Sequence, residues 1–227
     1  MFIRRLIIAV LWNAAVFGGV LFWGAGTIHW WRAWVFVGVA VVATVVTMVG
    51  VLRDRQDLLK ERFKGIIQRG QPWIDRLIVL PFVFAFGFLF WLVPADVFRL
   101  HLLPPPSVIV SSLGLLLYVM GWWMVALSFQ ANRFAIPVVR HQTERGHVVV
   151  DTGVYSTVRH PMYVGVILMM FGMPLWLESY AAALFAFVPT LALVLRILVE
   201  ERYLRRELAG YEEYTQRVRY RLVPGVW

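Results

Sequence analysis

The chain has 227 residues, of which 60% are hydrophobic and 15% are charged, and its mean hydropathy is +0.71. Soluble domains contain about 45–50% apolar and about 25% charged residues, so this composition excludes an ordinary soluble domain and indicates an integral membrane protein. The absence of Cys excludes disulfides, thiolate catalysis and Cys-ligated metals. The net charge of +9 lies in the connections between apolar segments, which favours contact with membrane lipids over nucleic-acid binding.

Six apolar segments are long enough, or nearly long enough, to cross a bilayer. We predict them at residues 6–27, 33–52, 77–93, 108–129, 161–177 and 180–199. Only a tight turn at Glu178-Ser179 separates the last two, which predicts a C-terminal helical hairpin. Residues 54–75 mix apolar and charged side chains and predict a short amphipathic helix at the membrane interface.

All Lys and Arg residues except Arg32 and Arg99 fall at one end of the six predicted segments. Positively charged connections are typical of the cytoplasmic side of a membrane. We therefore predict an all-α, multi-pass integral membrane protein with about six transmembrane helices and with both termini in the cytoplasm.

The connection at residues 131–160 is about 30 residues long and has no strong helical period. Loops of this length in a compact protein are usually functional or disordered. The apolar run at residues 148–150 and the modest charge argue against disorder. We therefore expect an ordered loop that folds onto another part of the molecule.

This loop ends in Arg159-His160-Pro161, and proline disfavours helix at the residue before it. The fifth segment is therefore expected to begin at Pro161 or at the next residue. Arg159, His160 and Tyr163 would then lie at a helix N-terminus on the membrane surface, which suits an anionic or polar ligand. Arg and His in such a position are also ordinary interface anchors, so both interpretations stay open.

The charged tail contains two pairs spaced i,i+4, Glu201 with Arg205 and Glu213 with Arg217. Ordinary surface pairs explain this spacing. However, Glu200 and Glu201 lie at the mouth of the sixth segment, level with the end of the long loop. Ionisable groups at the mouth of a membrane segment favour a functional site.

Two separated blocks of the sequence carry a resemblance to a known family. They are Asn132, Phe134 and His147-Val-Val-Val-Asp-Thr-Gly-Val-Tyr-Ser-Thr-Val-Arg-His-Pro-Met-Tyr-Val-Gly165, then Glu200-Glu201-x-x-Leu204, Gly210-Tyr-x-x-Tyr214-x-x-Arg217-Val218 and Pro224. Together they resemble the isoprenylcysteine carboxyl methyltransferase family, and the related membrane phospholipid methyltransferases share much of this pattern. The resemblance covers about residues 132–224, whereas residues 1–130 match only as hydrophobic helices. Animal members of the family tend to have Asn-Phe-x-His where this chain has Asn132-Arg-Phe-Ala-Ile-Pro137, a difference in a region that could touch the substrate.

The resemblance implies that S-adenosylmethionine, whose product is S-adenosylhomocysteine, binds at the cytosolic face, and that a lipophilic substrate enters from the bilayer. The long loop, the last hairpin and the tail would form the cofactor site. Residues 1–130 would be the N-terminal transmembrane helices and residues 131–227 the methyltransferase core. The cofactor-binding residues that it implies are His147, Val149, Tyr155, Arg159, His160, Tyr163 and Glu200. The catalytic residues that it implies are Glu201, beside the cofactor, and Arg217, facing the substrate carboxylate.

Methyl transfer from a sulfonium requires alignment and desolvation but no metal and no covalent intermediate. A carboxylate acceptor is already ionised at neutral pH and needs only a positioned cation, which an Arg side chain provides with two parallel donors. An amine acceptor would instead need a base, for which Glu201 and His160 are candidates. We therefore predict methylation of the carboxylate of an isoprenylcysteine-like lipid, with N-methylation of a phospholipid amine as the alternative.

Three other interpretations are weaker. His141, His147 and His160 fall in one loop, but their spacing fits no zinc pattern, so we predict no metal. Membrane sterol reductases, which use NADPH, share the Arg-His-Pro-x-Tyr-x-Gly theme but generally have Asn where this chain has Met162. A non-catalytic membrane protein that binds the same ligand is the third.

Overall fold

The computed structural model describes residues 2–227, and over this range the chain is helical with no strand. The α-helices are α1 (Phe2–Ala25), α2 (Trp31–Thr47), α3 (Gln56–Arg62), α4 (Trp73–Ala95), α5 (Val108–Ala131), α6 (Pro161–Trp176), α7 (Tyr180–Phe185), α8 (Phe187–Glu207) and α9 (Tyr211–Arg217). Shorter pieces are the π-helical η1 (Met48–Leu52) and η2 (Asp96–Leu100), which extend α2 and α4, and the 3-10 helices η3 (Thr143–Arg145) and η4 (Gly153–Ser156).

Within residues 2–227, five helical stretches are long and apolar enough to cross a membrane. They are Phe2–Ala25, Trp31–Leu52, Trp73–Leu100, Val108–Ala131 and Tyr180–Glu207. The remaining predicted crossing is α6, which is apolar but has only 16 residues, fewer than the roughly 20 of a usual span. The prediction of an all-α, multi-pass membrane protein is confirmed, and a sixth crossing depends on α6.

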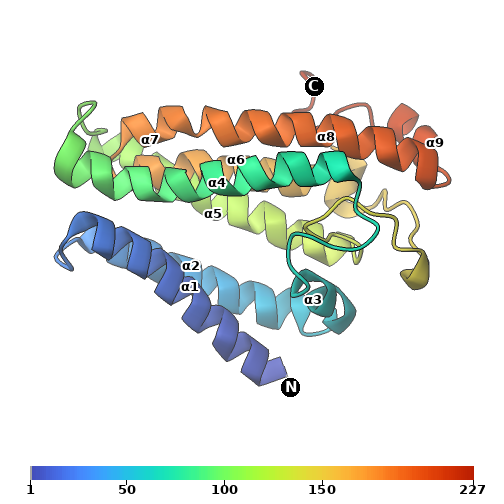
Figure 1. Cartoon of the computed structure of the whole chain (residues 1–227), viewed down its shortest axis with the longest axis horizontal. Coiled ribbons are helices and arrows are strands. Elements are labelled where there is room, and N and C mark those ends of the chain that lie inside the picture. The colour runs from blue at the N-terminus through green and yellow to red at the C-terminus, as the bar shows by residue number, and fades with distance from the viewer. Residues whose placement is uncertain (1) are drawn as a thin grey trace.

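The long helices run side by side, so their connections gather at two ends of the molecule (Figure 1). The start of α1, α3, the loop 131–160 and α9 lie at one end. The turns from α1 to α2, from α4 to α5 and from α6 to α7 lie at the other. Arg32, at the start of α2, and Arg99, in η2, are at this second end. The fold therefore separates the charges in the way that the six predicted segments require.

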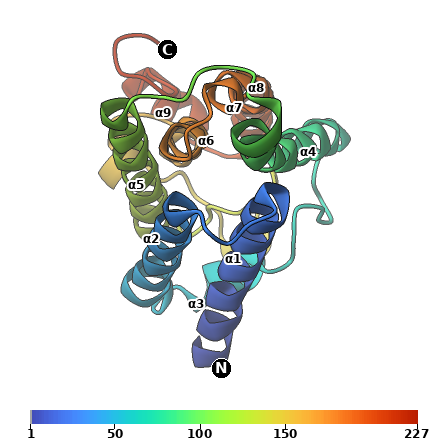
Figure 2. The same cartoon turned by 90° about the vertical axis from the view of Figure 1, so that its left-hand side faces the viewer.

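Helices α5 and α6 make the most extensive helix pair of the bundle, and they lie together when the bundle is seen end-on (Figure 2). Glycines bring the two backbones into contact: a Cβ at Gly121 would lie 2.5 Å from the carbonyl oxygen of Gly165, and one at Gly172 would lie 2.5 Å from the amide nitrogen of Tyr118. Small residues allow such close packing in membranes. Because α5 leads into the long loop and α6 follows it, this contact fixes both ends of the loop.

The boundaries of the last three long segments follow from local sequence. Helix α6 begins at Pro161, as predicted, because proline needs no amide partner in the first turn. The hairpin turn is where it was expected: Glu178 has a φ of 69°, and the hydroxyl of Ser179 accepts a hydrogen bond from the amide of Ala182 at 3.0 Å. The break between α7 and α8 precedes Pro189, which cannot donate to the carbonyl four residues earlier.

The amphipathic helix predicted within residues 54–75 is present but short. Only α3 is helical there, and the chain from residue 63 to residue 72 is irregular. Leu58 and Leu59 are buried against a small apolar cluster that includes Met48, Phe129 and Ile136. Helix α3 is therefore packed onto the end of the bundle and onto the long loop.

Candidate active site

A cavity lies at the end of the bundle that carries the long loop. The loop 131–160, the start of α6, the end of α8 and α9 form its walls. All seven predicted cofactor-binding residues line this cavity, namely His147, Val149, Tyr155, Arg159, His160, Tyr163 and Glu200. The two predicted catalytic residues, Glu201 and Arg217, are not part of its lining. The structure thus brings the first set together, and the roles of its members stay predictions.

The loop presents unused hydrogen-bonding groups to the cavity. Among residues 2–227, no hydrogen bond engages the backbone amide or carbonyl groups of Val148, Val149 or Val150, all of which line the cavity. The Nε group of Arg140, another lining residue, is buried without a partner. A buried polar group such as Arg140 Nε is normally paired, and the backbone groups of residues 148–150 keep free donors and acceptors. This wall is therefore suited to a ligand that carries both donors and acceptors.

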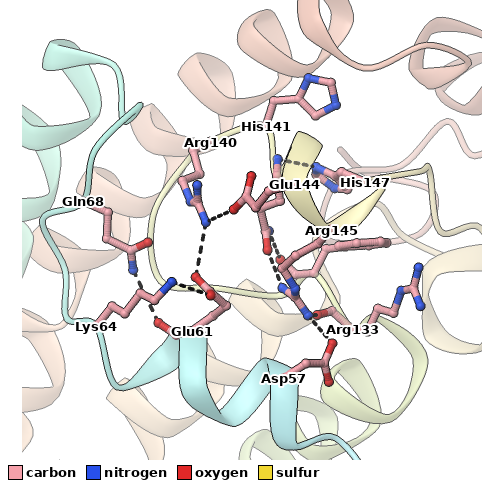
Figure 3. Close-up of polar contacts among 12 residues, drawn as sticks. Asp57, Glu61, Lys64, Gln68, Arg133, Arg140, His141, Glu144, Arg145 and His147 are labelled. Carbon is pink, nitrogen blue, oxygen red and sulfur yellow. Dashed lines mark hydrogen bonds and ion pairs between the residues drawn. The ribbon is translucent and has the colours of Figure 1, made fainter.

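His147 is held as a neutral imidazole in this wall. Its Nδ1 accepts a hydrogen bond from the backbone amide of Gln142 at 3.4 Å (Figure 3). Its ring lies 4.5 Å from the ring of Phe134, centre to centre. Burial lowers the pKa of His147 to about 4. Because Nδ1 accepts, Nε2 carries the proton at neutral pH and has no partner among the described residues, so it can donate to a ligand.

The acidic side of the cavity is formed by Glu200. The hydroxyl of Tyr163 donates a hydrogen bond to Glu200 Oε2 at 2.6 Å, which leaves Oε1 able to accept from a ligand. The Tyr163 ring is stacked against the ring of His160, with 5.5 Å between the ring centres. The first residues of α6 and the end of α8 are thereby tied together across the cavity.

Glu201 is buried next to the cavity, and its carboxylate contacts three side chains. Its carboxylate accepts hydrogen bonds from Arg159 Nε at 2.6 Å and Arg221 Nε at 2.9 Å, and its Oε1 lies 3.2 Å from His160 Nε2. The same Arg159 donates to the carbonyl oxygen of Val218 at 2.6 Å. The side chain of Glu201 is only 4% exposed. Glu201 therefore orients two cavity residues and fastens the tail, and these contacts give the motif pair Arg159-His160 a role beyond anchoring at the interface.

Both pairs predicted from the i,i+4 spacing in the tail are wrong. Glu201 pairs with Arg159 and Arg221 instead of Arg205, which contacts Glu212. The side-chain pairing of Arg217 is with Asp151 of the loop, at 2.8 Å, instead of Glu213. The break at Gly210, which has a φ of 82°, ends α8 and turns α9 so that the tail contacts the loop. These tertiary contacts replaced the local pairs.

The structure does not bring Arg217 to the cavity. Its side chain is 65% exposed, and its only charged partner among residues 2–227 is Asp151 on the outer surface. The predicted contact of Arg217 with a substrate carboxylate therefore stays a prediction, and this arrangement does not support it.

Sequence reasoning missed a buried ion pair beside the cavity, formed by Asp75 and Arg196. Asp75 Oδ1 accepts from Arg196 Nε at 2.8 Å, and its Oδ2 accepts from the amide of Val139 at 3.1 Å. Arg196 also donates to the carbonyl oxygen of Pro137 at 2.6 Å. The signal for this pair was an arginine inside an otherwise apolar segment, since such residues in membrane helices usually face a polar partner.

Helix α3 fastens the long loop from the outside (Figure 3). Asp57 accepts from Arg145 at 2.5 Å, and Glu61 accepts from Arg140 at 3.2 Å. Arg140 also donates a hydrogen bond to Glu144 within the loop. In the part of the chain that the structure describes, no group of three or more His, Asp or Glu side chains is arranged to hold a metal ion.

Most residues of the cavity wall lie in a part of the chain that is similar to known proteins. The sequence profile of a family described as phospholipid methyltransferase matches residues 109–209. Protein-S-isoprenylcysteine O-methyltransferase of Saccharomyces cerevisiae is 36% identical over 110 residues, which are 47% of this chain and 46% of the yeast protein. Protein-S-isoprenylcysteine O-methyltransferase B of Arabidopsis thaliana is 31% identical over 112 residues, which are 48% of this chain and 57% of the plant protein.

The chain thus spans about half the length of the curated relatives that it matches. These matches confirm the resemblance that the two motif blocks predict, in a multi-pass membrane protein whose matched half contains most of the cavity wall. The matched region of the chain is therefore similar to protein-S-isoprenylcysteine O-methyltransferases and to a phospholipid methyltransferase family.

Proposed function

We propose that this protein is an S-adenosylmethionine-dependent membrane methyltransferase that methylates the carboxylate of an isoprenylcysteine-like lipid. The observation that carries the proposal is the convergence of all seven cofactor-binding residues of the motif blocks on one cavity. The names of the relatives support the reaction class and the carboxylate acceptor.

The cavity wall fits the proposed cofactor, which supplies an electrophilic methyl group on a sulfonium. The open backbone groups of residues 148–150 offer donors and acceptors to an adenine or ribose, and His147 Nε2 offers a further donor. Glu200 Oε1 can accept from an ammonium or a hydroxyl group. His160 and Tyr163 close the wall toward α6, and Glu201 holds His160 and Arg159 in place.

The contacts of Glu201 argue against its acting as the base that an amine acceptor would need. An amine must lose a proton in order to be methylated, so it needs a base that can reach it. Glu201 is behind the wall and contacts Arg159, His160 and Arg221, so it is not free to act as that base. A carboxylate acceptor needs no base and only alignment and exclusion of water.

N-methylation of a phospholipid amine is the second candidate. The match of residues 109–209 to the phospholipid methyltransferase profile favours it. In that case Glu200, the carboxylate that lines the cavity, replaces Glu201 as our candidate base.

The cavity end of the bundle faces the cytoplasm in this proposal, together with both termini. The concentration of Lys and Arg at this end supports the orientation. We assign the methyltransferase core to residues 131–227 and add α5 to it, because the family match begins at residue 109 and α5 packs along α6. The earlier helices of the chain would form the membrane support.

The test is binding of S-adenosylhomocysteine to the detergent-purified protein, measured by calorimetry, with NADPH as the paired control. We expect micromolar affinity for S-adenosylhomocysteine and no binding of NADPH. Methyl transfer is then measured with N-acetyl-S-farnesylcysteine and, separately, with phosphatidylethanolamine. Methylation of the farnesyl compound alone supports the first proposal, whereas methylation of the amine lipid alone supports the second. Binding of NADPH without S-adenosylhomocysteine would refute both.

A further inference from the structure

Arg62, the last residue of α3, is a positive charge without a negative partner beside the cavity wall. One of its Nη groups donates to the carbonyl oxygen of Ala135 at 3.0 Å, and its guanidinium carbon lies 4.3 Å from the centre of the Phe129 ring. Among residues 2–227, no carboxylate is within ion-pair distance of Arg62. Its Nε and its other Nη group have no hydrogen-bond partner in that part of the chain.

The buried arginines among residues 2–227 differ from Arg62, which is only partly buried. Each of them has a carboxylate partner: Arg32 with Glu178, Arg159 with Glu201, and Arg196 with Asp75. Taking a charge out of water without a partner is unfavourable, so proteins normally pair such groups. Arg62 is only partly buried, and its free N–H groups are not enclosed by protein, so they remain open to a ligand while no side chain of residues 2–227 occupies them.

The position of Arg62 on α3 explains why no nearby side chain supplies this anion. Arg62 follows Leu58 and Leu59 by four and three residues, so it shares their face, which packs into the apolar cluster. Glu61 points to the other side and contacts Arg140 and Lys64 (Figure 3). Packing of Arg62 against the apolar cluster lowers its pKa to about 10, which leaves it a cation at neutral pH.

Arg62 is separated from the cavity by one residue. Its hydrogen-bond acceptor, Ala135, lines the cavity. The apolar cluster around α3 includes Ile136 and is packed against Met162, and both of these also line the cavity. The same apolar cluster thus borders both the cavity and the face of α3 that carries Arg62.

We propose that Arg62 binds the negatively charged group of the lipophilic acceptor, an inference that rests on the proposed methyltransferase function. The free edge of a guanidinium binds two oxygens of a carboxylate or a phosphate through parallel N–H donors. The anion is therefore the carboxylate of a prenylcysteine or the phosphodiester of a phospholipid. In this arrangement Arg62 takes the role of holding the acceptor that the motif alone assigns to Arg217.

The test is a binding titration on the full chain in detergent, saturated with S-adenosylhomocysteine. Two pairs of ligands differ only in the anionic group: N-acetyl-S-farnesylcysteine against its methyl ester, and phosphatidylethanolamine against diacylglycerol. We expect the wild type to prefer the charged member of one pair by at least about tenfold. Arg62→Gln should reduce this preference to within about threefold while leaving the affinity for the neutral member and for S-adenosylhomocysteine unchanged. Arg62→Lys should keep part of the preference.

The matched control is Arg202→Gln, an exposed arginine of α8 at the same end of the molecule, which should keep the full preference. If Arg62→Gln fails to bind S-adenosylhomocysteine, Arg62→Met is used in its place, since an apolar side chain suits this environment. A preference confined to the phospholipid pair and lost on substitution supports Arg62 and refutes the prenylcysteine acceptor. A full preference in the Arg62 variant, or none in the wild type, overturns the assignment of Arg62. Loss of S-adenosylhomocysteine binding in the wild type would instead refute the proposed function, and with it the acceptor role.

Discussion

Asp75 and Arg196 form a buried ion pair that joins α4 to α8, with 2.8 Å between Oδ1 and Nε. Asp75 belongs to the half of the chain outside the family match, whereas Arg196 belongs to the matched half. Through the amide of Val139 and the carbonyl of Pro137, the pair also holds the loop segment that lines the cavity. The N-terminal half of the chain therefore helps to position the wall of the cavity.

We expect Asp75→Asn to destabilise the protein by about 3–5 kcal/mol, because it leaves Arg196 buried without a counterion. Thermal unfolding in detergent measures this effect. Asp54→Asn is the control, since Asp54 is exposed and should change stability by less than about 0.5 kcal/mol. The double variant Asp75→Leu with Arg196→Met should recover part of the loss. Equal stability of Asp75→Asn and the wild type would show that the pair does not hold the loop.

Gly165 is required by packing, because a Cβ there would lie 2.5 Å from the carbonyl oxygen of Gly121. We expect Gly165→Ala to separate α5 from α6, to cost about 1–3 kcal/mol and to weaken S-adenosylhomocysteine binding, since both helices border the loop. Gly87→Ala on α4 is the control, because nothing lies within 4 Å of the added Cβ. If both variants behave alike in unfolding and in calorimetry, the close contact of the two helices is not what forms the site.

Much of the fold could be predicted from the sequence because its signals are local. The length of the apolar segments predicted the long helices, and Pro161 predicted the start of α6. The motif blocks predicted seven residues that line the cavity. The contacts that hold the site together could not be predicted, because their partners are far apart in the chain. Asp75 and Arg196 are 121 residues apart, and the i,i+4 spacing in the tail favoured local pairs that the fold replaces with Arg159 and Asp151.

Glu201 should act as a positioning residue. Glu201→Gln removes the charge that Arg159 and Arg221 share, so we expect S-adenosylhomocysteine affinity to fall by at least about tenfold. Glu213→Ala is the matched control in the same tail, since Glu213 is exposed, and it should bind within about twofold of the wild type. Calorimetry measures both variants. If Glu213→Ala lost its affinity for S-adenosylhomocysteine, the register assigned to the tail would be wrong.

The loop should loosen in acid because of His147. The pKa of His147 is about 4 in the folded protein, below the usual value of about 6.5, because burial disfavours the charged ring. The unfolded chain therefore binds more protons between these values, and stability is lost as the pH falls from about 6.5 toward 4. Thermal midpoints measured across this range should fall less in His147→Gln than in the wild type. Parallel pH profiles would mean that His147 is not buried as a neutral ring.

Arg217 and Arg62 are competing candidates for holding the acceptor, and their surroundings predict different results. The pair of Arg217 with Asp151 is exposed, and such pairs contribute only about 0–1 kcal/mol. We therefore expect Arg217→Ala to keep S-adenosylhomocysteine affinity within about tenfold and to lower methyl transfer less than Arg62→Gln does. Asp151→Asn, which breaks the same pair, should match Arg217→Ala in steady-state kinetics if the arginine is only a surface residue. Lost turnover in Arg217→Ala, with cofactor binding kept and Asp151→Asn active, would mean that Arg217 leaves Asp151 and reaches the acceptor, as the motif alone predicts.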